Sequence, residues 1–112
     1  MTDLLPHIVD VHDWPQPGIV FKDIAPLLAN AAAFAAAVDT LAATGRGPDG
    51  LATVDKVVGI EARGFILAAP VALALGVGFV PVRKAGKLPR DTFEEAYALE
   101  YGEASLEVQR DA

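Results

Sequence analysis

The chain contains no cysteine and only one tryptophan among its 112 residues. The absence of cysteine excludes a disulfide framework and a thiolate metal site, and it is typical of a reducing compartment. No apolar run reaches the roughly 18 residues that a membrane-spanning helix needs, and the first ten residues lack the basic and apolar pattern of a secretory leader. We therefore expect a cytoplasmic protein with no membrane partner.

Basic residues are also scarce, since nine Lys and Arg stand against fifteen Asp and Glu, for a net charge of -6. This balance argues against a general nucleic-acid binder, which needs a basic face. The distribution is more informative, because the window 62–90 contains no acidic residue and five of the nine bases: Arg63, Arg83, Lys84, Lys87 and Arg90. A local cationic segment in an acidic protein predicts a site for a small anion.

The composition, with 53% apolar and 21% charged residues, is typical of a globular protein. A chain of this length forms at most one domain, so we expect residues 1–112 to be a single domain or a piece of one.

The first third of the chain predicts three elements. Apolar residues recur at helical spacing over 3–12 and predict a short amphipathic helix. The Pro- and Gly-rich segment that follows has room only for a brief extended piece, Ile19 to Phe21. An alanine-rich helix is expected from a cap at Asn30 to a stop at Gly45.

The second part predicts a strand, a helix and a strand. The segment Val54 to Ile60 is rich in Val and Ile and is interpreted as a strand buried on both faces of a parallel sheet. The run 65–76 predicts a helix, with a late start or a kink required by Pro70, and 77–82 predicts the next strand. This βαβ order indicates an α/β fold, followed by a flexible loop and a β-hairpin formed by "YALEYG" and "SLEVQRD".

Both predicted strands end in basic loops, which in an α/β sheet is where ligands bind. The segment "IEARG" offers a glycine for close backbone approach, the Arg63 guanidinium and the free N–H groups that open a helix. Because "VRKAGKLP" leaves the same sheet edge one crossover away, two positive loops together predict a polyanion such as pyrophosphate. The alternative is a solvated loop in which Arg63 pairs with Glu61.

Four blocks of the sequence, "DWPQPGIVFKDIAPLL", "GIEARGF", "VPVRKAGKLP" and "YALEYGEASLEVQRDA", resemble the adenine phosphoribosyltransferase family in that order. The resemblance runs from about Val11 to Ala112 and implies a phosphoribosyltransferase-type, Rossmann-like fold with a parallel sheet flanked by helices. It implies transfer of ribose 5-phosphate from phosphoribosyl pyrophosphate (PRPP) to adenine, giving AMP and pyrophosphate in purine salvage. It also implies Mg²⁺ bound with PRPP or pyrophosphate, and a homodimer.

The resemblance also implies roles for individual residues. The predicted pyrophosphate and PRPP site comprises Glu61, Ala62, Arg63, Gly64, Arg83, Lys84 and Lys87. Adenine would lie on Phe21, with main-chain groups around Val20 and Lys22 reading its edge. Many relatives have Arg where this chain has Lys22.

Two catalytic residues follow from the last block. The resemblance implies that Glu100 accepts the proton of the purine N7 and that Tyr101 closes over the site. Without the resemblance, Phe21 is an ordinary core aromatic and Glu100 a surface strand residue. Trp14 is interpreted as a packing residue, and His7 and His12 have no partners that would predict a metal site.

Relatives continue beyond "VQRDA" into a strand that ends in two acidic residues and a Thr- and Gly-rich loop that binds the 5-phosphate. We therefore expect a C-terminally truncated domain that lacks roughly a third of the fold and leaves an apolar sheet edge uncovered. Such a chain is expected to be inactive alone and poorly stable without a partner. The alternative functions are a non-catalytic purine and pyrophosphate sensor, or a remnant without a function of its own.

Overall fold

The computed structural model of the chain describes residues 3–99 and 102–112. The chain divides into two compact units, Met1–Ala43 and Thr44–Ala112, and each is described by itself. The expectation of a single domain stays a prediction. Within the described residues, no helix has the length and hydropathy to cross a membrane.

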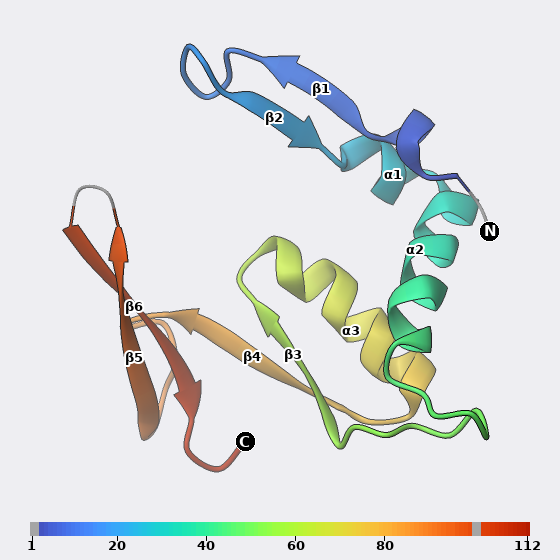
Figure 1. The fold of residues 1–112 in the computed structure, drawn as a ribbon. Helices are drawn as coiled ribbons and strands as arrows, with labels where there is room; N and C mark the ends of the chain where they lie inside the picture. Colours follow the sequence, from blue (N-terminus) through green and yellow to red (C-terminus); the bar gives the residue numbers. More distant parts are fainter. Residues whose placement is uncertain (1–2, 100–101) are drawn as a thin grey trace. The chain divides into compact units, whose positions relative to one another are not determined.

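The first unit contains a β-hairpin and two helices (Figure 1). Its elements are the 3-10 turn η1 (Leu5–His7), the strands β1 (Val9–His12) and β2 (Val20–Asp23), and the helices α1 (Ala25–Ala29) and α2 (Ala31–Ala43). The two strands pair antiparallel, with Val11 opposite Phe21. The extended piece predicted around Ile19 to Phe21 is therefore confirmed as β2.

The helix predicted over 3–12 is wrong. Only Leu5–His7 forms a helical turn, and Val9–His12 is a strand. Leu5, Ile8 and Val11 recur at helical spacing, whereas the β-branched Val9 and Val11 alternate as in a pleated strand, and the hairpin partner decides between the two.

Helix α2 begins as predicted, because the Asn30 side-chain Oδ1 accepts a hydrogen bond from the Ala33 N–H at 3.0 Å. Helix α1 was not predicted, since Pro26 was interpreted only as a breaker. It lies instead in the first turn of α1, where a missing N–H costs nothing. The core of this unit consists of Leu27, Ala33 and Ala37.

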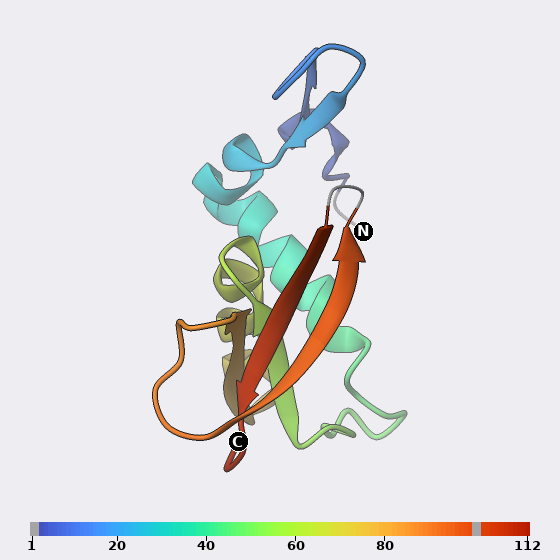
Figure 2. The ribbon, with the colours of Figure 1, turned by 90° about the vertical axis from the view of Figure 1, so that its left-hand side faces the viewer.

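The second unit is a four-stranded mixed sheet with one helix (Figures 1 and 2). Its elements are β3 (Lys56–Ile60), α3 (Arg63–Leu75), β4 (Gly78–Lys84), β5 (Thr92–Leu99) and β6 (Gly102–Gln109), in the strand order β3-β4-β6-β5. Strands β3 and β4 are connected by α3 and pair directly with each other in parallel, so the predicted βαβ unit is confirmed. The predicted hairpin is also confirmed, but the position of its turn is wrong, because Gly102, Glu103 and Ala104 lie in β6 and pair with β5.

The hairpin joins the parallel pair only at the end of β4. Arg83 pairs with Glu107 and Lys84 with Leu106, both antiparallel, and Figure 1 shows β4 reaching β6 at this point. The basic end of β4 therefore pairs with β6, just beyond the last residue of β4 that pairs with β3, Val82.

Two expectations about this unit need correction. Helix α3 does not start late, because it begins at Arg63 and contains Pro70 in its interior. Strand β3 is not buried on both faces, since the side chains of Val58 and Ile60 are 56% and 50% exposed. The physical reason is that β3 is an edge strand whose one covered face packs against α3. The predicted stop at Gly76 is confirmed, with a left-handed φ of 70°.

Candidate functional site

The parallel strands β3 and β4 end side by side, and the predicted anion-binding loops start there. The Glu61 N–H donates to the Val82 carbonyl at 3.0 Å, which extends the pairing by one residue past β3. The Glu61–Ala62 peptide bond is cis, and α3 begins at the next residue, Arg63. Only two residues therefore separate the strand from the helix N-terminus.

The side chain of Glu61 is the centre of this site. Its carboxylate is only 9% exposed. Oε1 accepts the Lys84 N–H at 2.7 Å and lies 3.3 Å from Arg83 Nε, and Oε2 accepts a hydrogen bond from Lys87 Nζ at 2.7 Å. We call Glu61 with Arg83, Lys84 and Lys87 the cationic cluster. The structure thus brings together four of the residues predicted to hold pyrophosphate.

These contacts lower the pKa of Glu61 to about 2, first through the Lys87 ammonium and then through the Lys84 N–H. Glu61 is therefore ionised at neutral pH and can only accept hydrogen bonds. A carboxylate in this state cannot donate to a phosphate oxygen. Glu61 was predicted to belong to the pyrophosphate site. Its described contacts support only a role in binding the basic residues there.

Arg83 makes a longer contact with Glu61 than Lys87 does, 3.3 Å against 2.7 Å. Its Nε lies within ion-pair distance of Glu61, yet this buried nitrogen makes no hydrogen bond among the described residues. The guanidinium carbon lies 5.9 Å from the centroid of the Phe65 ring. Charge and aromatic packing position this side chain, and a further acceptor would satisfy it.

The loop after β4 is fastened by a second carboxylate, Glu107 of β6. Its Oε1 accepts the Gly86 N–H at 2.6 Å, and its other oxygen accepts from the Thr92 hydroxyl. Further along, Arg90 pairs with Asp111 at the base of the hairpin. The fifth base of the cationic window therefore has an acidic partner away from Glu61.

A residue that the sequence reasoning missed, Gly59, sets the distance between β3 and α3. A Cβ atom added there would lie 2.8 Å from the Ala68 Cβ, 2.9 Å from the Gly64 carbonyl oxygen and 2.9 Å from Phe79 Cε1. Glycine inside an apolar strand is a signal for such a close backbone approach. Gly59 therefore allows the first turn of α3, with Arg63 and Gly64, to sit against the strand.

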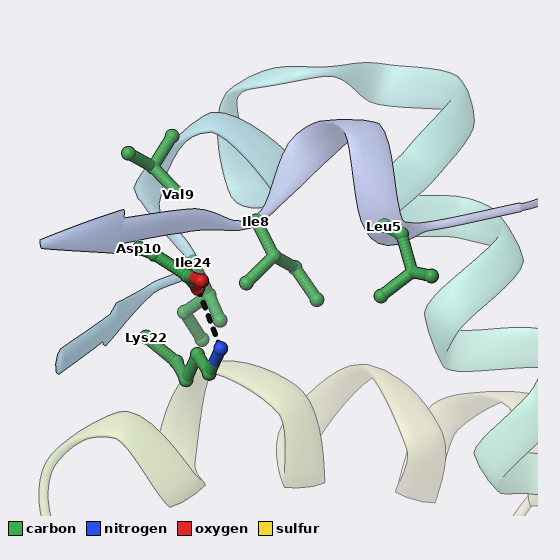
Figure 3. A pocket seen from close by; sticks show the side chains of 6 residues that line it. All are labelled: Leu5, Ile8, Val9, Asp10, Lys22 and Ile24. Atoms are coloured by element: carbon green, nitrogen blue, oxygen red, sulfur yellow. Dashed lines mark hydrogen bonds and ion pairs between the residues drawn. The ribbon is translucent and has the colours of Figure 1, made fainter. Parts of the chain in front are cut away.

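The predicted adenine residues lie in the β1–β2 hairpin of the first unit, with Phe21 and Lys22 on opposite faces. Lys22 Nζ pairs with Asp10 Oδ1 at 2.6 Å, beside a hollow lined by the residues drawn in Figure 3: Leu5, Ile8, Val9, Asp10, Lys22 and Ile24. That adenine is read by main-chain groups around Val20 and Lys22 stays a prediction.

Phe21 lines a second, smaller hollow together with Val11, Trp14 and Asp23. The Phe21 and Trp14 rings meet edge to face, with centroids 4.6 Å apart and planes at 70°. Trp14 packs as predicted, yet its side chain is half exposed. An aromatic pair at the surface of a hairpin is suited to a flat, apolar ligand.

The catalytic residues and a metal site are the predictions that remain. Glu100 and Tyr101 lie outside the described residues. Within the described residues, no three His, Cys, Asp or Glu side chains form a group that would hold a metal ion. Glu61 is also unsuited to Mg²⁺, because both of its oxygens face basic groups.

Comparison with known proteins gives a consistent result, although no family model matches the chain. The chain is 67% identical over 112 residues to adenine phosphoribosyltransferase of a Nocardioides species, and 64% identical over 106 residues to that of Acidothermus cellulolyticus. These alignments include 100% and 95% of this chain but 60% and 58% of the relatives. The chain therefore spans about three fifths of the length of the curated relatives it matches.

Solved structures agree. The adenine phosphoribosyltransferase of Thermoanaerobacter pseudethanolicus superposes with a TM-score of 0.85 at 47% identity, over 97% of this chain and 61% of that one. The Saccharomyces cerevisiae enzyme, solved with an iminoaltritol bisphosphate and adenine, gives a TM-score of 0.90 at 39% identity, over 97% and 62%. The predicted resemblance and the phosphoribosyltransferase-type fold are thereby confirmed.

Proposed function

We propose that this chain, which is similar along its whole length to adenine phosphoribosyltransferases, carries the base and pyrophosphate sites of that activity. The reaction is transfer of the 5-phosphoribosyl group of PRPP to adenine, giving AMP and pyrophosphate. The observation that carries the proposal is the contact of the Arg83 and Lys87 side chains and the Lys84 main-chain N–H with Glu61, at the ends of two parallel strands and before the N-terminus of α3.

This arrangement suits a diphosphate leaving group. In the proposed reaction the bond between ribose C1 and a pyrophosphate oxygen breaks, the bond between C1 and purine N9 forms, and a purine proton is lost to an acceptor. Negative charge develops on the departing oxygens, and fixed cations together with the N–H groups that open α3 stabilise it. We propose Glu100 as the proton acceptor and Tyr101 as a cover.

For adenine we propose the face of Phe21, which Trp14 buttresses from the side. Strand β2 has β1 on one side in the described sheet, and main-chain groups on its other side, around Val20 and Lys22, would read the purine edge. The relative from Saccharomyces cerevisiae, whose structure contains adenine, supports this choice of base.

The accompanying ion and assembly are proposals of the same kind. The Mg²⁺ would enter on the phosphate oxygens of PRPP, because the described residues offer it no group of carboxylates. When bound to the phosphates, Mg²⁺ neutralises part of their negative charge. The proposed reaction uses no metal ion held by the protein. A cytoplasmic homodimer is proposed by resemblance.

The second candidate is a non-catalytic protein that binds purine and pyrophosphate, because the Phe21 hollow and the bases around Glu61 would serve binding alone equally well. We expect the 112-residue polypeptide to bind pyrophosphate and adenine without turnover, whereas AMP formed by the pure chain from adenine, PRPP and Mg²⁺ would contradict this expectation. Calorimetric titration with pyrophosphate tests the site itself. Lys87→Met should weaken binding by roughly tenfold, as for loss of one charge-assisted contact.

The matched control is Lys56→Met, which removes the same charge at the opposite end of β3. Its pyrophosphate affinity should equal that of the wild type. If wild-type protein binds no pyrophosphate, or if both variants bind as the wild type does, the proposed function is wrong.

A further inference from the structure

A carboxylate at the centre of a pyrophosphate site needs an explanation, because it repels the ligand. We propose that Glu61 is an affinity-determining counter-ion: it gathers the bases of the cationic cluster and competes with the diphosphate for them, so that the anion is held only moderately and can leave. This inference rests on the proposed function.

The contacts of Glu61 exclude the more obvious roles. Both carboxylate oxygens already accept hydrogen bonds, from the Lys84 N–H and from Lys87 Nζ, each at 2.7 Å. An ionised carboxylate has no proton to donate to a phosphate oxygen. Its basic neighbours also make it a poor metal ligand. What remains is the effect of its charge on the bases around it.

That charge acts in two directions. Arg83 and Lys87 bring two positive charges to Glu61, which carries one negative charge, and Lys84 adds its main-chain N–H, so the cationic cluster still attracts an anion. Without the carboxylate, the like charges of Arg83 and Lys87 would lose the group that holds them together. With the carboxylate present, an entering diphosphate must share Lys87 with Glu61. It must also approach the negative charge of a side chain that is only 9% exposed.

The consequence concerns release. A site built only of cations would bind the free diphosphate product as strongly as it stabilises the charge that develops during the reaction. Product release would then be slow, and it is the rate-limiting step of many enzymes. Tight binding of a ground state does not itself speed the chemical step. A counter-ion inside the site weakens binding of the free diphosphate while it keeps the bases in place.

The decisive variant is Glu61→Gln, which keeps an acceptor for the Lys84 N–H and removes the charge. We expect it to bind pyrophosphate about tenfold more tightly at low salt, through slower dissociation, with a smaller gain at higher salt because of screening. Glu61→Asp, which keeps the charge, should remain close to the wild type. Calorimetry and stopped-flow kinetics measure both quantities.

The matched control is Glu107→Gln. Glu107 fastens the same loop through the Gly86 N–H, and its contacts in the described structure include no ion pair. Its pyrophosphate affinity should stay within about twofold of the wild type at moderate salt, where long-range charge effects are screened. Adenine is a neutral ligand, so its affinity should be the same in all variants.

Wild-type protein offers a measurement that needs no folded variant. In carboxyl ¹³C NMR, saturating pyrophosphate should raise the pKa of Glu61, because the anion takes part of the Lys87 charge. An unchanged Glu61 titration, or a folded Glu61→Gln variant that binds pyrophosphate as weakly as the wild type or more weakly, would overturn the counter-ion role. Failure of the wild type to bind pyrophosphate would instead overturn the proposed function.

Discussion

The substitution Gly59→Ala tests the link between the β3–α3 packing and the cationic cluster. The new methyl group would lie 2.8 Å from the Ala68 Cβ and 2.9 Å from both the Gly64 carbonyl oxygen and Phe79 Cε1. Unstrained contacts between carbon atoms are about 3.5–4.0 Å, so α3 must retreat by roughly 0.6–1 Å. No flexible side-chain end is available to absorb the shift, except by rotation of Phe79.

The expected magnitude follows from two opposing effects. Overpacking of this kind costs about 1–3 kcal/mol, and replacing glycine by alanine returns about 0.4–1 kcal/mol by restricting the unfolded chain. We therefore expect Gly59→Ala to lower the free energy of unfolding by about 1–2 kcal/mol. Because Gly64 and Arg63 start the displaced helix, pyrophosphate binding should weaken as well.

Urea denaturation followed by circular dichroism measures the stability, and calorimetry the binding. The control is Gly78→Ala in the neighbouring strand, where the added Cβ would meet only the flexible Lys56 side chain, at 3.4 Å and beyond. That variant should stay within about 0.5 kcal/mol of the wild type. Adding Ala68→Gly to Gly59→Ala should cost less than Ala68→Gly alone, because it removes one clash. If Gly59→Ala is as stable as the wild type, the packing argument is wrong.

Two further predictions concern single side chains. The pKa of Glu61 is lower in the folded protein, about 2 against 4.5, so its contribution to stability is complete above pH 4.5 and is lost as the pH falls from about 4.5 to about 2. Urea unfolding of wild type and Glu61→Gln across this range should therefore converge at acid pH, and a constant difference would contradict the assignment. Trp14→Leu should lower the free energy of unfolding of the first unit by about 0.5–1.5 kcal/mol or more, because it removes the edge-to-face contact with Phe21. Trp14→Phe, which keeps an aromatic ring, should lower it by less. Equal stabilities of the two variants in thermal unfolding would show that the ring pair contributes nothing specific.

Much of the candidate site could be predicted from sequence because its basic residues sit at element ends. The apolar runs of β3, α3 and β4 have clear periodicity, and strands joined by a crossover helix are parallel, so their basic ends must lie together. This reasoning predicts Arg83, Lys84 and Lys87 from the sequence alone. Glu61 was predicted as a site residue by resemblance, but its contact with Lys87 was not predicted, because the two residues lie 26 positions apart in the chain.

The sequence by itself determined the elements whose signals are local: the Asn30 cap, the Gly76 stop and the βαβ order, since each depends on neighbouring residues and backbone propensity. Only the tertiary structure decided that Val9–His12 is a strand, because the apolar residues of this region show both helical and alternating spacing until Val20–Asp23 pairs with the segment. It also decided that one carboxylate holds the bases and that Gly59 admits the helix. Pairing and packing of this kind depend on atoms brought close in space from distant parts of the chain, which local sequence patterns do not encode.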